Sequence, residues 1–185
     1  MKNALVIHGA YGNNQDNWIP WLVQNLAQQG YAVTAPNFPT PEHQNLTAWL
    51  QVINELQYNF NNETVIIGHS IACAFMLSIL EQHTVKQAIF VAGFIDDLTT
   101  PEFDATQFDT INTTFYAKQF NWEAINNNTK NITIIHSDND PYVPLWHAEK
   151  IGTQLNVKPL IIPGGGHFGS REGCVEFPEL LEVII

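Results

Sequence analysis

The fold of this chain is decided by residues 64–72, which read TVIIGHSIA. Residues 65–67 are an unbroken run of β-branched apolar side chains, which is typical of a strand buried on both faces of a sheet. Residues 70–82 are apolar on nearly every side until their polar end, which predicts a buried helix. The strand and the helix meet at residues 68–70, which leave no room for a longer loop.

Ser70 lies on this tight turn. A serine so placed is raised above the sheet in a strained backbone conformation, and only small residues fit two positions before and after it. Gly68 and Ala72 meet that demand, although Ala72 stands where the usual pattern G-x-S-x-G has a second glycine. The nonapeptide alone is explained equally well by a nucleophilic serine and by a serine that merely caps the helix. The rest of the chain distinguishes the two interpretations.

Strands and helices alternate along the chain. The predicted strands are residues 4–7, 31–35, 65–67, 87–94, 131–135 and 157–162. The further predicted helices are one capped by Asn17 and ended by Gly30, one capped by Asn45 and running over 46–56, one over 144–155, and one that begins at Pro178. The alternation, without repeats or a linker, predicts a parallel sheet covered by helices on both faces. Trp18, Trp21 and Trp49 occur at helical spacing and are expected in the core.

Residues 95–129 break the alternation. The segment is rich in Asp, Asn, Thr and aromatic residues, and it is too long for an ordinary connection, so it is expected to contain one or two short helices. Its aromatic side chains either pack the segment itself or wall an acyl pocket beside the site. These side chains are Phe103, Phe108, Phe115, Tyr116, Phe120 and Trp122.

The composition argues against several classes of function. The formal net charge is -11 with only 7 Lys and Arg residues, which disfavours nucleic acid and anionic membrane surfaces, since both require clustered cations. The two cysteines, Cys73 and Cys174, make no disulfide framework. No stretch approaches a membrane span, and the apolar run near the N-terminus is too short for a signal peptide. A cytoplasmic protein is therefore expected.

Four unusual loops follow predicted strands and converge on one edge of the sheet. They are residues 8–10, 68–70, 137–140 and 165–167. In parallel sheets, ligands bind beyond the carboxyl ends of the strands, which is where these loops lie.

Three of these loops carry the parts of a serine nucleophile. A serine hydroxyl needs a base to take its proton, and the base needs a carboxylate to hold its tautomer and stabilise its cation. Ser70, Asp140 and His167 occur in the order that α/β-hydrolases use, each just past a predicted strand end. We therefore take these three as the candidate catalytic residues.

Two acids compete for the third role. Asp138 leaves the predicted strand early, where an aspartate commonly accepts hydrogen bonds from nearby backbone amides. Asp140 lies further along the loop, directly before Pro141, and is the favoured partner of His167.

The oxyanion of the reaction also requires N–H donors. One is expected from the amide of Ile71, just after the serine, and the other from the first loop, at Ala10 or alternatively Tyr11. We assign substrate binding to Tyr11 and His69, which lie beside these groups. Histidines in such loops more commonly hold backbone geometry, so no direct catalytic step is assigned to His8 or His69.

No metal or cofactor site is expected. His136 and His147 lack metal-ligand spacing with any nearby Cys, Asp or Glu, and H-E-x-x-H is absent. The glycines at 9–12 and 164–166 do not match G-x-G-x-x-G, so a dinucleotide fingerprint is absent too.

At these residues the sequence resembles the family of small serine hydrolases typified by retinoblastoma-binding protein 9 and the bacterial YdeN-type proteins. The resemblance runs from near residue 3 to the C-terminus. It is carried by His8-Gly9, residues 17–22, residues 36–39, Trp49, residues 68–70, residues 140–144 and residues 166–168. It implies an α/β-hydrolase fold with little or no cap, a triad of Ser70, Asp140 and His167, and no metal or organic cofactor. Ala72 departs from the glycine of many relatives.

We therefore predict one α/β-hydrolase domain over residues 1–185. Its expected architecture has three layers, αβα, with a six-stranded parallel sheet in the order 2-1-3-4-5-6 and a minimal cap. The expected activity is hydrolysis of carboxylic esters, or less favourably amides, of small acyl groups through an acyl-Ser70 intermediate. The alternative is a non-catalytic protein-interaction module that keeps the hydrolase fold.

Overall fold

The structure, a computed structural model, describes residues 1–99 and 104–185. Six strands form one parallel sheet in the order β2-β1-β3-β4-β5-β6, which confirms the predicted topology. The strands are β1 (Asn3–Ile7), β2 (Ala32–Thr34), β3 (Thr64–His69), β4 (Gln87–Val91), β5 (Asn131–Ser137) and β6 (Leu160–Ile162).

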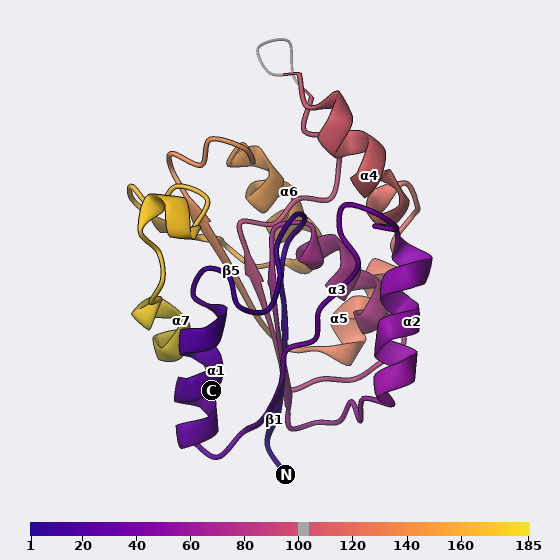
Figure 1. Cartoon of the computed structure of the whole chain (residues 1–185). Coiled ribbons are helices and arrows are strands. Elements are labelled where there is room, and N and C mark those ends of the chain that lie inside the picture. The colour runs from indigo at the N-terminus through magenta and orange to yellow at the C-terminus, as the bar shows by residue number, and fades with distance from the viewer. Residues whose placement is uncertain (100–103) are drawn as a thin grey trace.

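Helices cover both faces of the sheet, which makes three layers (Figure 1). On one face lie α1 (Ile19–Gln28) and α7 (Pro178–Val183). On the other lie α2 (Leu46–Leu56), α3 (Ala72–Leu80), α4 (Thr106–Tyr116), α5 (Trp122–Asn128) and α6 (Trp146–Leu155). The predicted short helices of residues 95–129 are α4 and α5.

Each face of the sheet has its own apolar core. On the side of α2 and α3, Trp49 packs edge-on against Phe75 and Phe115. On the side of α1 and α7, Trp18 packs edge-on against Phe177. Trp18 and Trp49 are fully buried, as their helical spacing predicts. Such aromatic packing contributes about 1 kcal/mol per pair beyond area burial.

The central strand and its helix are the most buried elements. β3 pairs with both β1 and β4, and every residue of β3 and α3 is buried. The two elements touch so closely at Gly68 that a Cβ there would lie 2.4 Å from Met76 Sδ and 3.2 Å from Ala72 Cβ. Glycine is therefore required where strand and helix cross.

Helix caps agree with the sequence at one position and not at another. The side chain of Asn45 accepts the amide of Ala48 and caps α2, as predicted. The expected cap at Asn17 is wrong, because this residue lies at φ +55° and its side chain accepts the amide of Ser170 instead. Asn17 thus ties the start of α1 to the loop near the C-terminus.

The last strand is shorter than expected. Residues 157–162 were predicted as strand, but β6 begins only at Leu160. The amide of Val157 donates to Gly152 O at the end of α6, and Pro159 has no N–H to offer a neighbouring strand. The residues before Leu160 are thus occupied in ending the helix.

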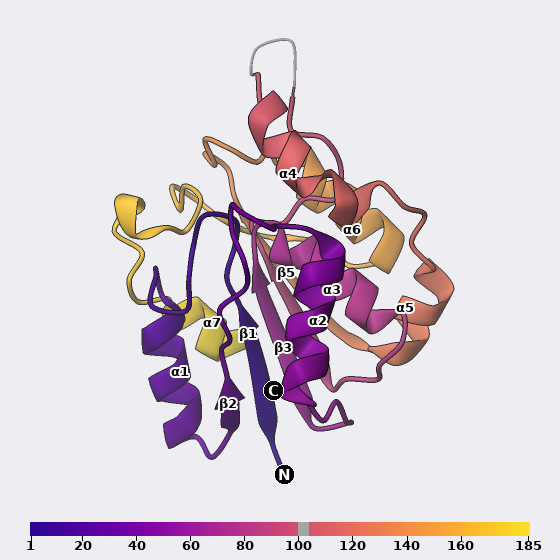
Figure 2. The ribbon, with the colours of Figure 1, turned by 45° about the vertical axis from the view of Figure 1, so that its right-hand side comes forward.

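The carboxyl ends of β1, β3, β5 and β6 share one edge of the sheet, and the N-terminus lies at the other (Figure 2). α4 stands above the carboxyl edge. None of the helices within the described residues combines the length and the hydropathy of a membrane span.

Candidate active site

Ser70 occupies the strand-to-helix turn in the strained conformation that the sequence predicts. Its φ is +60°, a left-handed value that a residue with a side chain rarely adopts. The amide of Ser70 donates to Val91 O at 2.9 Å, which fastens the turn to the neighbouring strand β4. Ser70 is 8% exposed, so its hydroxyl is held at the surface of a cavity and not in the core.

The loop after β1 packs directly on this turn. A Cβ on Gly9 would lie 3.0 Å from Ser70 Cβ and 3.3 Å from His69 O. Only glycine permits such an approach without displacing the turn. The backbone of residues 9–11 is thereby brought beside the serine.

His8 holds the same loop from behind. Its Nε2 accepts the amide of Phe38 at 2.9 Å, so the proton is on Nδ1, which donates to Gly9 O at 2.7 Å. Burial lowers the pKa of His8 and keeps the imidazole neutral. His8 therefore acts on the backbone, as expected for a histidine in this position.

Two backbone amides close to the serine in the chain or in space, those of Ala10 and Ile71, have no hydrogen bond acceptor among the described residues. The amide of Tyr11, the alternative donor, instead donates to Thr40 Oγ1 at 2.7 Å. The geometry therefore favours Ala10 over Tyr11 as the donor from the first loop. Ile71 lies at the start of α3, where the helix dipole also favours negative charge.

Asp140 and His167 form the second half of the site. Nδ1 of His167 donates to Oδ2 of Asp140 at 2.7 Å, and the side chain of Asp140 is 1% exposed. Oδ1 of Asp140 accepts the amides of Tyr142 and Val143 at 2.9 and 3.0 Å. Burial opposes ionisation, but the contacts from His167 and these amides outweigh it and lower the pKa of Asp140. The carboxylate is thus charged and fixed in orientation.

Asp138, the competing acid, is engaged elsewhere. Its Oδ1 accepts the amide of Gly164 at 2.8 Å. This is the backbone role that the sequence offered as its alternative. Between the two acids, the structure joins His167 to Asp140.

Hydrogen bonds join the loop of residues 137–140 to the loop of residues 164–167, and the sequence did not predict this connection. Asn139 Oδ1 accepts the amide of Gly166 at 2.8 Å, and Ser137 Oγ donates to the carbonyl of the same glycine. Together with Asp138 and Asp140, four consecutive residues hold the loop that carries His167. The composition of residues 137–140 was the available signal, because each of these side chains can hydrogen bond.

His69 contacts His167 directly. Its Nε2 donates to His167 O at 2.8 Å, and the two ring centroids lie 4.7 Å apart. Burial, with the nearby His167, lowers the pKa of His69 to about 3. His69 is therefore neutral and positions the backbone of His167. It also lines the cavity, beside which the sequence predicts a role for it in substrate binding.

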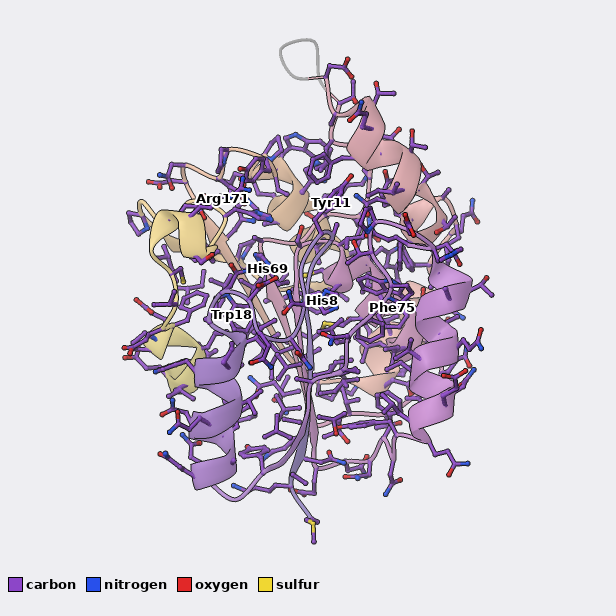
Figure 3. The ribbon with its side chains drawn as sticks, in the orientation of Figure 1. His8, Tyr11, Trp18, His69, Phe75 and Arg171 are labelled. Carbon is purple, nitrogen blue, oxygen red and sulfur yellow. The ribbon has the colours of Figure 1, made fainter. Side chains whose placement is uncertain are left out.

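A cavity of about 620 Å³ joins these parts. Its wall includes the five predicted site residues Ser70, His167, Ala10, Tyr11 and His69. Figure 3 places His8, Tyr11 and His69 at the upper end of the sheet, with Arg171 across from Tyr11. A mainly apolar part of the wall contains Phe94, Leu98, Phe108, Asn112, Tyr142 and Val143. A polar part of the wall contains Asp16, Asn17, Ser170, Arg171 and Glu172.

Ser70 and His167 meet at this cavity without a hydrogen bond between their side chains among the described residues. A nucleophile and its base are often held more loosely before substrate binds. The arrangement offers a serine, a base fixed by a charged carboxylate, and two amides for an oxyanion. These are the parts that acyl transfer requires.

The aromatic residues of residues 95–129 are divided between the two expected roles. Phe108 lines the cavity and packs edge-on against Tyr11 at 5.3 Å. Phe115 and Tyr116 are buried in the core instead. Phe103 lies outside the described residues. In the part that the structure describes, no group of three His, Cys, Asp or Glu side chains is placed to hold a metal ion.

The sheet order, the serine at the β3–α3 turn and the loops at the carboxyl edge define an α/β hydrolase. The model of the serine hydrolase family matches residues 4–185, and the chain belongs to that family. It is 26% identical to YdeN of Bacillus subtilis, over 99% of this chain and 94% of YdeN. It is also 26% identical to the serine hydrolase RBBP9 of Rattus norvegicus, over 98% of this chain and 92% of that protein.

Solved structures agree with this assignment. The crystal structure of the Bacillus subtilis ydeN gene product has a TM-score of 0.87 at 25% identity and covers 99% of this chain and 96% of its own. Est1E from Butyrivibrio proteoclasticus has a TM-score of 0.68 at 18% identity, covering 98% and 88%, which is a likeness of fold alone. The resemblance predicted from the sequence is confirmed.

Proposed function

We propose that the chain is a carboxylesterase-like serine hydrolase that cleaves esters of small acyl groups through an acyl-Ser70 intermediate, with amides as less favoured substrates. The observation that carries the proposal is the 2.7 Å hydrogen bond between His167 and the buried Asp140, beside the cavity that also holds Ser70. It leaves Nε2 of His167 as the basic nitrogen.

In the proposed reaction, Nε2 of His167 takes the proton of Ser70 while Oγ attacks the ester carbonyl carbon. The charge of Asp140 stabilises the imidazolium that forms. The oxyanion accepts hydrogen bonds from the amides of Ala10 and Ile71, each worth about 3 kcal/mol of barrier.

Collapse of this tetrahedral species breaks the bond to the alcohol, which takes the proton from His167. Water then repeats the cycle on the acyl-enzyme, with His167 as base and then as acid, and releases the carboxylic acid. The apolar wall of the cavity, with Phe94, Leu98 and Phe108, supports an acyl group at this site.

Labelling with a fluorophosphonate probe tests the proposal. We expect the wild type to be labelled and to hydrolyse p-nitrophenyl esters, with a preference for short acyl chains. Ser70→Ala should lose both the label and at least about 10³-fold in turnover. If well-folded wild type takes no label and turns over no ester, the chain is better explained as a binding module with a hydrolase fold.

A further inference from the structure

His136 is a buried histidine to which the proposed reaction gives no role. It lies on β5, an inner strand of the sheet (Figure 1), and it is 0% exposed. Its Nδ1 has no hydrogen bond partner among the described residues. Burial of a polar ring costs free energy unless its hydrogen bonds compensate, and Nε2 is the atom of His136 that makes one.

Nε2 of His136 fixes the loop that carries the carboxylate of the site. It lies 2.9 Å from the carbonyl oxygen of Val143, which can only accept, so Nε2 carries the proton and donates it. The amide of the same Val143 donates to Oδ1 of Asp140 at 3.0 Å. Val143 is thus bound through its amide to Asp140 and through its carbonyl to β5, the strand from which the loop leaves.

His136 leaves the other carboxylate oxygen to His167. Its Nε2 is 4.0 Å from Oδ2 of Asp140, which is too long for a hydrogen bond, whereas Nδ1 of His167 lies 2.7 Å from the same oxygen. The positive end of the Nε2–H dipole of His136 is nevertheless close to Oδ2, which favours the ionised form of Asp140.

The ring of His136 is neutral. Burial lowers its pKa, although the charge of Asp140 acts in the opposite direction. A second proton would enter at Nδ1, which has no acceptor among the described residues. The other titratable groups that act on the ring are His167 and, on α6, His147, and neither supplies a negative charge. A neutral His136 does not compete with His167 for the charge of Asp140.

We propose that His136 is a positioning residue: by holding the carbonyl of Val143, it keeps Asp140 in the orientation that binds Nδ1 of His167. It acts through these groups, since it is not among the described residues that line the cavity. The inference rests on the hydrolase function proposed above, and it adds a side chain on which the base of that reaction depends.

Three substitutions of His136 separate its donor from its bulk. His136→Phe keeps a ring of similar size without a donor, and His136→Asn carries its amide near the position of Nδ1, too short to reach the carbonyl of Val143. His136→Gln can place an N–H donor near the position of Nε2. His147→Phe is the matched control, because His147 is equally buried and neither of its nitrogens has a partner among the described residues.

The kinetic readout is the hydrolysis of p-nitrophenyl butanoate as a function of pH. In His136→Phe and His136→Asn we expect kcat to fall about tenfold or more, because a catalytic group is misplaced, and KM to change less than about twofold. The acid-side midpoint of the kcat/KM profile should move to lower pH, since a misplaced carboxylate stabilises the imidazolium of His167 less. His136→Gln and His147→Phe should keep kcat within about threefold of wild type and leave the midpoint unchanged.

A second readout does not depend on turnover. The Nδ1 proton of His167, held in a short hydrogen bond to a carboxylate, is expected to give a low-field NMR signal that isotope labelling of histidine identifies. This signal should be present in wild type, His136→Gln and His147→Phe. In His136→Phe and His136→Asn it should be lost or broadened by exchange with solvent.

Thermal melts report which variants fold. The inference is overturned if a folded variant without the donor keeps both the NMR signal and the acid-side midpoint of wild type, or if His136→Gln loses as much activity as His136→Phe. Failure of both His136→Phe and His136→Asn to fold also overturns it, because the role of His136 is then purely structural. If wild type shows the NMR signal but neither hydrolyses esters nor takes the fluorophosphonate label, the proposed function fails, whereas the signal still reports whether His136 positions Asp140.

Discussion

Replacing Asp140 by asparagine is expected to abolish most turnover by changing the tautomer of His167. Oδ1 of Asp140 accepts two backbone amides, from Tyr142 and Val143. The oxygen of an asparagine must stay in that position, because its NH₂ group cannot accept those donors. The NH₂ group then faces Nδ1 of His167 and forces this nitrogen to accept. The proton of the imidazole moves to Nε2, so this nitrogen can no longer take a proton from Ser70.

The size of the effect follows from two losses. The wrong tautomer removes the base, and the missing charge no longer stabilises the imidazolium. For a triad in which only the tautomer is changed, the loss in kcat is about 10⁴-fold, or about 5.5 kcal/mol. Folding should be affected much less, because both backbone amides keep their acceptor.

The assay is the steady-state hydrolysis of p-nitrophenyl butanoate, with fluorophosphonate labelling rates as a second readout. Asp138→Asn is the matched control, since an asparagine oxygen can still accept the amide of Gly164. Its kcat should stay within about threefold of wild type. The reasoning is refuted if Asp138→Asn loses turnover while Asp140→Asn keeps more than a tenth of it.

Two further predictions concern stability. Burial lowers the pKa of His147 to about 4, whereas an unfolded histidine titrates near 6.5, so only the unfolded chain takes up a proton there between these values. The contribution of neutral His147 to the unfolding free energy is complete above about pH 6.5 and is lost as the pH falls. His147→Phe should therefore reduce the drop in unfolding free energy between pH 7 and pH 5 by about 2 kcal/mol in urea titrations. An unchanged drop would contradict the assignment. Gly68→Ala should lower the unfolding free energy by about 1–3 kcal/mol in thermal melts, since its Cβ would lie 2.4 Å from Met76 Sδ and 3.2 Å from the backbone of Ala72. An unchanged melting temperature would show that the strand and the helix can accommodate the methyl group.

The fold could be predicted from the sequence because its signals are local and repeated. The buried strands are short apolar runs, clearest in the β-branched residues 65–67, and helices such as α1 and α2 carry an apolar face that packs on the sheet. One error falls where a single residue has a choice of partners. Asn17 has the chemistry of a helix cap, but its side chain binds the amide of Ser170, which lies far along the chain. No local pattern reports such a contact.

The candidate site is also a prediction from the sequence. The order of Ser70, Asp140 and His167, each after a strand, is visible in the sequence because parallel strands bring their carboxyl ends together. The sequence also left two acids, Asp138 and Asp140, as candidates for the partner of His167. It left two amides, those of Ala10 and Tyr11, as candidates for the oxyanion donor of the first loop. The structure favours one of each by showing what the other is bound to: Gly164 for Asp138, and Thr40 for Tyr11.

The hydrogen bonds from Tyr11 to Asn112 therefore have two consequences at once. At one end they occupy the amide of Tyr11, which supports the amide of Ala10 as the donor that we propose for the oxyanion. At the other end they reach Oδ1 of Asn112, whose Nδ2 is buried without an acceptor among the described residues. Thr40 and Gln44 join these ends through side chains from a segment with no catalytic motif. The order of the candidate catalytic residues is thus visible in the sequence, whereas the hydrogen bonds that join the first loop to α4 exist only in the folded chain.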